Sequence, residues 1–359
     1  MTRCTRCIIP ESFPGVTFDE DGICSLCRSH SNTRRRSDEE ALLRLVESAR
    51  SGSRFDCVVP LSGGKDSTYI LYLAVRELGL RVIAANHDQG YQSDMARANV
   101  RHACEALGVP LVTSSPDHEA GRLMLREMLH VSEILGCFTR TCTDCEFMLR
   151  SLAISSAREH DVPFILWGSS SLESPDDADY DEYRHGRGGL EILSSKLQRL
   201  RELALTPGQA VALAPHVLSY ASLSARRRRS MGAPLKYVVN PFGLVPFPEA
   251  SPAIIHFFDY ADWDPHAATE VLERELGWRH PEGREARFDC RLYCFVEHRE
   301  LELTGLTDSG AIASRLIREG RLTREQALAM EEETRRRIIS ECETIVREAG
   351  LPDYRMPDV

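Results

Sequence analysis

The sequence lacks any apolar run long enough to cross a membrane, because no uninterrupted apolar stretch approaches the ~18 residues that such a helix needs. Its first residues, MTRCTRCIIPESF, also lack the long apolar segment of a secretory signal. An excess of basic residues is missing too, since 44 lysines and arginines face 54 aspartates and glutamates, for a net charge of −10. These absences predict a cytoplasmic protein with no membrane partner, and the acidic balance argues against nucleic acid as a partner.

What the chain does contain is enough apolar material for a sizeable core. Hydrophobic residues make up 42% of its 359 residues and charged residues 27%, which excludes wholesale disorder. The chain also holds 12 cysteines. In a reducing cytoplasm we expect these to act as metal ligands, reactive thiols or core residues, and not as disulfides.

Short apolar runs alternate with helical patterns between residues 55 and 172. The predicted strands are Phe55–Leu61, Arg81–Asn86, Pro110–Thr113 and Pro163–Trp167, and the predicted helices are 67–79, 92–107, 118–135 and 146–160. Such alternation is typical of an α/β fold with a parallel sheet and helices on both faces. Ligands of these sheets bind beyond the carboxyl ends of the strands, so we expect the chemistry at that edge.

Four regions are predicted along the chain. They are a cysteine-rich module at 1–36, a nucleotide-binding domain at 37–172, an insertion or lid with the substrate region at 173–255, and a mainly helical C-terminal region at 256–359. Within the last region, Asp264-Pro265 is a helix start and Thr323–Gln326 fits a capping box.

The least regular pattern lies between residues 173 and 255. Acidic residues from Asp176 to Glu182 indicate a loop-like insertion, and Arg226–Arg229 is a basic run. Such runs usually form a solvated face, and contact with a phosphate-bearing substrate is the alternative. We expect this region to close over the site as a lid.

A glycine-rich turn links the first predicted strand to the first predicted helix. Its sequence, Ser62-Gly63-Gly64-Lys65-Asp66-Ser67, combines glycines that let the backbone approach an anion with the amides of a helix N-terminus. Ser62 and Ser67 can donate hydroxyl hydrogen bonds, Lys65 adds positive charge, and Asp66 is a candidate ligand of Mg²⁺. The spacing excludes the Walker pattern, which has four residues between its first glycine and its Gly-Lys pair. The turn therefore predicts a phosphate-binding loop, with a turn that binds no ligand as the alternative.

Four cysteines near the N-terminus are arranged as two close pairs. Cys4 and Cys7 form one C-x2-C pair, a gap of 16 residues follows, and Cys24 and Cys27 form the second. This spacing is typical of a tetrahedral structural Zn²⁺ site, which adds folding energy to a segment too short for its own core. Four unliganded thiols and a rubredoxin-like iron site are the alternatives.

A second cysteine cluster precedes the last of the four predicted helices. Its C-x2-C pair, Cys142 and Cys145, could bind a metal, cycle as a dithiol or cap the helix. An iron–sulfur cluster would need a further ligand, for which Cys137, Cys290 and Cys294 are candidates. A purely structural pair is the alternative.

In its strand–turn–helix context the glycine-rich turn resembles the PP-loop of the ATP pyrophosphatases. That family cleaves ATP between the α and β phosphates and adenylates an oxygen of its substrate. The resemblance implies an adenine nucleotide α-hydrolase-like (HUP) fold, ATP and Mg²⁺ as cofactors, and catalytic roles for Lys65, Asp66 and Ser67. It also implies nucleotide contacts by residues at the ends of the second and fourth strands, namely Asn86, His87, Asp88, Gly168 and Ser169.

Beyond this loop, the chain resembles the N-acetyl sugar amidotransferases of surface-polysaccharide and sialic-acid-like sugar biosynthesis. The matching segments are Cys4–Pro10, Pro14–Asp19, Gly22–Cys24, Phe55–Ser67, Arg287–Cys290 and Ile317–Ala327. The resemblance implies adenylation of an acetamido oxygen on a sugar, after which ammonia displaces AMP and leaves an acetamidino group. It also implies a separate glutaminase as partner, because no glutaminase domain is recognisable in the chain.

The layout is also similar to that of PP-loop tRNA thiolation enzymes, in which a comparable C-x2-C pair helps to hold an iron–sulfur cluster. This similarity implies catalytic roles for Cys142 and Cys145, Cys290 as a third ligand of a [4Fe-4S] cluster, and a sulfur donor protein as partner. Sulfur transfer is therefore the alternative to amidotransfer. A nucleotide-binding scaffold without catalysis is the remote alternative.

Overall fold

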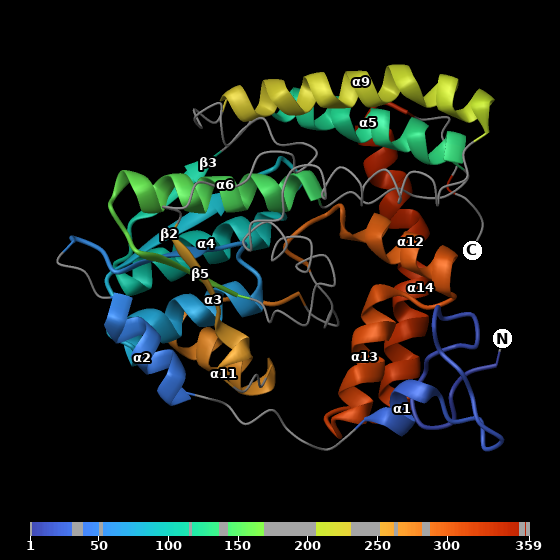
Figure 1. Ribbon diagram of the computed structural model, residues 1–359, viewed down its shortest axis with the longest axis horizontal. Coiled ribbons are helices and arrows are strands. Elements are labelled where there is room, and N and C mark those ends of the chain that lie inside the picture. The colour runs from blue at the N-terminus through green and yellow to red at the C-terminus, as the bar shows by residue number, and fades with distance from the viewer. Residues whose placement is uncertain are drawn as a thin grey trace.

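The computed structural model describes residues 2–30, 39–49, 53–114, 117–135, 143–168, 206–230, 252–261, 265–281, 288–351 and 356. These residues form a five-stranded sheet, helices on both its faces, and a helical C-terminal region against which the cysteine-rich N-terminal segment packs (Figure 1). All strand pairs are parallel, in the order β3-β2-β1-β4-β5. The strands are β1 (Cys57–Pro60), β2 (Val82–His87), β3 (Leu111–Ser114), β4 (Phe164–Trp167) and β5 (Ala253–His256).

The four strands and four helices expected between residues 55 and 172 are confirmed, with ends shifted by a few residues. In this part of the chain the helices are α3 (Lys65–Tyr72) with its π-helical continuation η1 (Leu73–Glu77), α4 (Asp94–Leu107), α5 (His118–Leu135) and α6 (Thr143–Glu159). The other helices are α1 (Ser25–Ser29), α2 (Glu39–Ala49), α9 (Pro207–Ser230), the 3-10 turn η2 (Phe257–Asp259), α11 (Pro265–Leu276), α12 (Tyr293–Thr304), α13 (Asp308–Arg318) and α14 (Arg324–Glu348).

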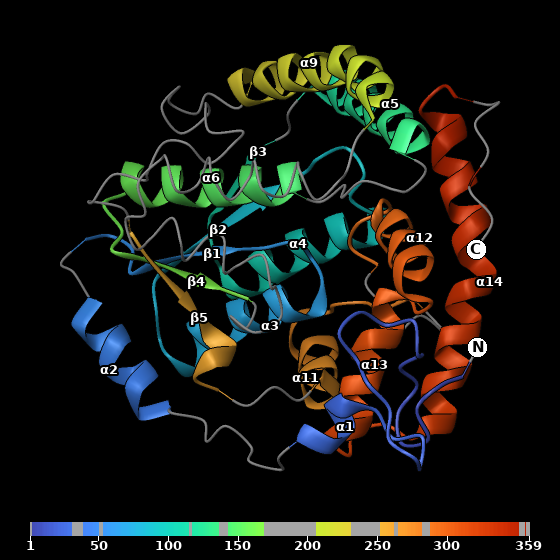
Figure 2. The same cartoon turned by 45° about the vertical axis from the view of Figure 1, so that its right-hand side comes forward.

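Helices bury both faces of the sheet, and alternate strand residues face different layers. Val59 and Ala84 pack with α3, α4 and α11, whereas Val58 and Ile83 pack with α6. Figure 2 shows α6 on one side of the sheet and α3 with α11 on the other. This double burial explains why the strands read as continuous apolar runs without alternation.

Between residues 173 and 255 the chain holds more regular structure than its sequence indicates. Residues 207–230 form α9, a helix of 24 residues with Pro215 inside it, and α9 lies along α5 (Figure 1). Residues 207–225 contain no Asp, Glu, Lys or Arg, so no charged stripe marks the helix in the sequence. Strand β5 was also not predicted, and it extends the sheet beside β4.

The first arginine of the basic run joins two helices. Arg226 forms ion pairs with Asp117 at 2.5 Å and with Glu119 at 3.3 Å, at the start of α5. Arg226 is itself exposed, in agreement with the expectation of a solvated face, while the side chains of Arg227–Arg229 lie outside the described residues.

Both helix starts predicted for the C-terminal region are confirmed. The Thr323 hydroxyl accepts a hydrogen bond from Gln326 N, and the Gln326 side chain accepts one from Thr323 N, which completes a capping box before α14. Helix α11 begins at Pro265, and Gly277 follows its end in the left-handed conformation. Of the helices that the structure describes, none is long and apolar enough to cross a membrane.

Candidate nucleotide site and metal centre

The predicted phosphate loop lies at the carboxyl edge of the sheet, between β1 and α3. Gly64 is the N-cap of α3, and no side chain caps this helix. The hydroxyl oxygens of Ser62 and Ser67 lie 3.1 Å apart. Ser62 Oγ accepts a hydrogen bond from Gly64 N at 3.2 Å, and Ser67 Oγ accepts one from Ser62 N at 3.1 Å. The loop is therefore closed by its own hydroxyls, and the positive end of the α3 dipole points to this edge, which suits an anion.

Close packing requires glycine at position 63 of this loop and leaves little space at Gly168. Gly63 has a φ of +85°, and a Cβ there would lie 2.2 Å from Ala96 O on α4. A Cβ on Gly168, directly after β4, would lie 3.2 Å from Ser67 Cα. The loop is thus held between α4 and the end of β4, so its conformation is fixed by the fold.

Three buried side chains hold the carbonyl groups of the loop. Gln92 Nε2 donates to Ser62 O at 2.7 Å, while Asn99 Nδ2 at 3.2 Å and Trp278 Nε1 at 3.0 Å both donate to Gly63 O. All three side chains are almost completely buried. These hydrogen bonds anchor the loop carbonyls to α4 and to the segments before α4 and after α11.

None of these three residues was singled out from the sequence. Asn99 offers the clearest signal, since it lies on the buried face of α4 with Ala96, Val100 and Ala103, where a polar residue interrupts an apolar stripe. Trp278 gives no such signal, because its role depends on a contact with a residue 215 positions away in the chain.

The three predicted nucleotide contacts at the end of β2 are buried. Asn86 Nδ2 donates to Leu61 O at 2.7 Å, which ties the end of β2 to the start of the loop. His87 Nδ1 lies 2.8 Å from Ser114 Oγ on β3, and Asp88 accepts a hydrogen bond from the backbone two residues later at 2.9 Å. Their contact with a nucleotide stays a prediction, and Ser169 lies outside the described residues.

A segment from the C-terminal region reaches the same edge. Cys290 forms an isolated antiparallel bridge with Gln92, and Ser93 N donates to Asp289 O at 3.0 Å. The carboxylate of Asp289 is close to the loop, since its Oδ2 lies 3.2 Å from the position of a Cβ on Gly64. The region before α12 therefore contributes to the candidate site.

Two cysteines of the predicted cluster lie towards the carboxyl edge. Gln89 Nε2 is 3.1 Å from the sulfur of Cys290. Cys145 lies in the first turn of α6, whose other end leads directly into β4, so that this first turn lies towards the carboxyl ends of the strands. Cys142 lies outside the described residues, and within them only the N-terminal cysteines form a group of three or more metal-ligating side chains. The cluster stays a prediction.

The four N-terminal cysteines converge, as their spacing predicts. The sulfur atoms of Cys4, Cys7, Cys24 and Cys27 all lie within 4.8 Å of one another, and all four side chains are buried. The backbone N–H groups of Cys7 and Cys24 point at Cys4 Sγ, at 3.5 and 3.3 Å. Four convergent soft donors in a closed, buried shell fit Zn²⁺.

Burial and hydrogen bonding give the thiols of this group different acidities. Burial raises the pKa of the Cys7 thiol to about 11. Burial also acts on Cys4, but the N–H donors of Cys7 and Cys24 outweigh it and lower the pKa of Cys4 to about 7. A metal ion must displace the proton of Cys7 at neutral pH, so its affinity for the site rises with pH.

The cysteine module is fixed to the C-terminal helices. Arg324 Nε, at the start of α14, donates to Cys7 O at 3.0 Å and to Cys4 O at 3.3 Å. The guanidinium of Arg3 lies 3.8 Å from the buried Glu331 carboxylate on α14. The module therefore packs on the same region of the chain that carries Asp289 to the phosphate loop.

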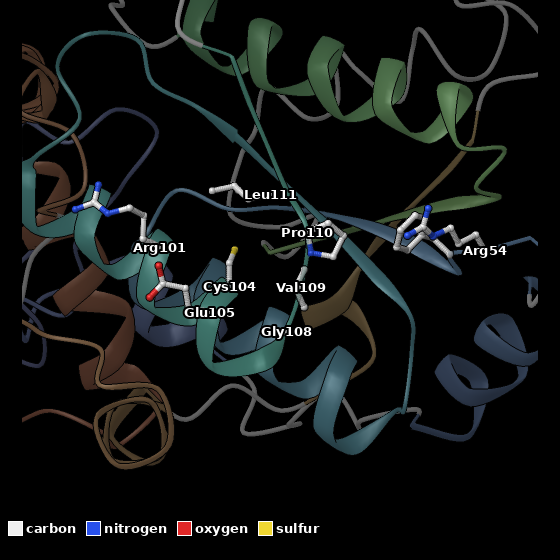
Figure 3. A pocket seen from close by; sticks show the side chains of 9 residues that line it. Arg54, Arg101, Cys104, Glu105, Gly108, Val109, Pro110 and Leu111 are labelled. Carbon is white, nitrogen blue, oxygen red and sulfur yellow. The ribbon is translucent and has the colours of Figure 1, made fainter.

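A cavity of about 680 Å³ lies at the opposite, amino edge of the sheet (Figure 3). Arg101, Cys104 and Glu105 line it from α4, and Arg54 lines it from the segment before β1. No predicted site residue lines this cavity. Ligands of parallel sheets bind at the carboxyl edge, so this cavity lies away from the edge where we expect a ligand.

No protein-family model matches the chain, and no curated protein matches its sequence. Weak similarity to solved structures is found. The U34-tRNA thiolase NcsA from Methanococcus maripaludis with its [4Fe-4S] cluster is 14% identical, with 89% of this chain and 87% of that chain covered and a TM-score of 0.34. The NH3-dependent NAD synthetase from Campylobacter jejuni is 15% identical, with 51% and 93% covered and a TM-score of 0.27. The NMN synthetase from Francisella tularensis is 13% identical, with 71% and 90% covered and a TM-score of 0.27. Similarities of this size assign no activity.

Proposed function

We propose that the protein is an ATP-dependent adenylating enzyme that converts an acetamido group of a sugar, or a similar carbonyl group of a small substrate, into an amidine. The observation that carries this proposal is the loop of residues 62–67, a strand-to-helix turn with an uncapped helix N-terminus, obligatory glycines and carbonyls anchored by buried donors. Such a loop suits a polyphosphate.

The proposed reaction has two steps. The acetamido oxygen attacks the α phosphorus of ATP, and pyrophosphate leaves. Ammonia then adds to the activated carbon, AMP leaves with the former acetamido oxygen, and loss of a proton gives the amidine. Lys65 and the N-terminal end of α3 stabilise the negative charge that develops on pyrophosphate, and Mg²⁺ supplies further charge neutralisation when bound.

Nitrogen as the entering atom is supported by the matching segments at both ends of the chain, which resemble sugar amidotransferases. A separate glutaminase would supply the ammonia. Sulfur transfer is the second candidate, and one observation favours it: Cys290 lies at the carboxyl edge next to the loop, with Cys145 on the turn of α6 that points there. A sulfur donor protein would then replace the glutaminase.

The test uses the purified full chain with ATP, ammonium chloride and a panel of free and nucleotide-linked N-acetyl sugars. We expect AMP and pyrophosphate, together with an acceptor whose mass falls by the difference between an oxygen atom and an NH group. Lys65→Ala should abolish both products, and Arg101→Ala, at the amino-edge cavity, should leave them unchanged.

The same assay shows whether nitrogen or sulfur enters the product. A mass that rises by the difference between sulfur and oxygen, with sulfide as donor and iron bound after anaerobic purification, would establish sulfur transfer. Absence of AMP with every acceptor and either donor would contradict the proposal.

A further inference from the structure

We propose that Asp289 provides an oxygen ligand for a divalent cation, Mg²⁺, that lies between this carboxylate and the phosphates of ATP bound at the loop of residues 62–67. The inference rests on the proposed function, because ATP is the ligand that brings the phosphates. It assigns a binding role to a residue more than 200 positions away from the loop in the sequence.

The backbone around Asp289 is fixed against the loop. Ser93 N donates to Asp289 O at 3.0 Å, and the neighbouring Cys290 forms a bridge with Gln92. From this anchored position the half-buried carboxylate faces Gly64, with Oδ2 3.2 Å and Cγ 3.4 Å from the site of a Cβ there. Gly64 is the N-cap of α3, so the carboxylate lies where the positive end of the helix meets the phosphate site.

Among the residues that the structure describes, the Asp289 carboxylate has no ion-pair partner. Within the described part of the chain, no hydrogen bond or ion pair joins the Asp289 carboxylate to another group. A phosphate bound beside Gly64 would therefore face an uncompensated negative charge at close range, which raises the free energy of the complex. A divalent cation between the two anions converts this repulsion into two attractive contacts.

A second oxygen of the same patch supports a cation. Gln92 is 3% exposed, and its Nε2 donates to Ser62 O. Its Oε1 is buried and, among the residues described, accepts no hydrogen bond. Carboxylate and amide oxygens are the protein ligands that Mg²⁺ takes, alongside substrate phosphates. The patch thus offers two oxygen acceptors, from segments joined by the Gln92–Cys290 bridge.

The structure also suggests an opposing role for the same side chain. A carboxylate at a helix N-terminus can occupy the place of a phosphate and compete with it. The two roles predict opposite effects of Asp289→Asn, since removal of a cation ligand weakens binding of the metal complex, whereas removal of a competitor strengthens binding.

The experiment measures binding of α,β-methylene ATP to the zinc-loaded full chain by calorimetry, with Mg²⁺ present and with Mg²⁺ omitted. We expect Mg²⁺ to tighten binding to the wild type by about tenfold or more, and Asp289→Asn to lose most of this gain. Asp289→Glu should keep part of it. The matched control is Asp161→Asn, in the turn between α6 and β4 at the amino edge, which should behave as the wild type.

Electron paramagnetic resonance of Mn²⁺ gives a second readout. With the analogue present, the wild type and Asp161→Asn should hold Mn²⁺ more tightly than Asp289→Asn does. If Asp289→Asn keeps the full gain from Mg²⁺, or binds the analogue more tightly than the wild type, the inference is wrong while the proposed function stands. If the wild type does not bind the analogue at all, the proposed function fails and the inference fails with it.

Discussion

The two edges of the parallel sheet differ: a cavity lies at one edge, and a loop held by buried side chains lies at the other. The amino edge has the cavity of about 680 Å³, which is lined by Arg54 and Arg101. At the carboxyl edge, buried Gln92, Asn99 and Trp278 fix the backbone of the phosphate loop. The comparison shows that the cavity and the loop with carbonyls held by buried side chains lie at opposite edges, and our proposal places the function at the edge that carries the loop.

Removal of the metal should give the largest effect, and this effect should be confined to the carboxyl edge and the C-terminal helices. Structural Zn²⁺ sites contribute roughly 10 kcal/mol of apparent binding energy to folding. After chelation we expect rapid hydrogen exchange in residues 2–30 and in α13 and α14, and weaker nucleotide binding, since Arg324 and Glu331 join the module to these helices. Exchange at the amino edge should stay as it was, and an equal loss of protection at both edges would contradict the coupling.

Alanine substitution of two glycines tests the loop against the opposite edge. Gly63 and Gly108 both have positive φ, +85° and +67°, so both substitutions strain the backbone. Only at Gly63 does the new Cβ clash, 2.2 Å from Ala96 O, whereas nothing lies within 4 Å of a Cβ on Gly108. We expect Gly63→Ala to lower the free energy of unfolding by about 3 kcal/mol or more and to abolish nucleotide binding.

The matched variant Gly108→Ala, at the end of α4 near the amino edge, should cost about 1 kcal/mol and keep nucleotide binding. Urea denaturation and calorimetry with α,β-methylene ATP measure both effects. Equal losses in the two variants would show that the contact with α4 does not matter.

A buried acid on α12, next to α13 in the C-terminal region, is expected to make stability depend on pH. Burial raises the pKa of Glu297 to about 7, although Ser309 N donates to it at 3.1 Å. In the unfolded chain a glutamate has a pKa of about 4.3. The folded protein therefore takes up a proton between these values, so the contribution of Glu297 to stability is full below about pH 4.3 and is lost as pH rises through 7.

The variant Glu297→Gln should remove this loss. Relative to the wild type, its free energy of unfolding should rise by roughly 3 kcal/mol between pH 4.5 and pH 8. Chemical denaturation at several pH values measures the difference, and parallel profiles for the two proteins would show that Glu297 does not titrate in this range.

The smallest expected effect compares single contacts at the two edges. Trp278→Phe removes the donor to Gly63 O at the carboxyl edge, and Arg81→Gln breaks the ion pair with Asp56, which spans 2.6 Å at the amino edge. Trp278→Phe should lower the free energy of unfolding by about 1–2 kcal/mol, and Arg81→Gln should lower it by less, because the Arg81 side chain is exposed and its ion pair is screened by solvent. Only Trp278→Phe should weaken nucleotide binding. A loss of binding in Arg81→Gln would contradict the expectation that only the carboxyl edge affects the nucleotide.

Features encoded by neighbouring residues could be predicted from the sequence. The strand-to-helix turn at 62–67 and the convergence of the two C-x2-C pairs each depend on a short spacing, so the residue types alone could predict them. The four strands β1 to β4 follow from apolar runs, because burial on both faces leaves a continuous apolar signal.

Features created by distant contacts could not be predicted. Trp278 reaches the loop only because the chain at the end of α11 folds back onto it. Strand β5 has four residues and pairs only with β4 at the border of the sheet, so its apolar signal is short. Helix α9 packs against α5 with no charged stripe to reveal its period.

Transfer of AMP to the acceptor oxygen can be measured directly by isotope labelling. The full chain is incubated with ATP, an ammonia source and an N-acetyl sugar whose acetamido oxygen is oxygen-18, and the released AMP is analysed by mass spectrometry. If the loop holds ATP for attack by that oxygen, the label appears in the phosphate group of AMP. Release of ADP and phosphate, or unlabelled AMP with the label retained in the sugar product, would contradict the central claim.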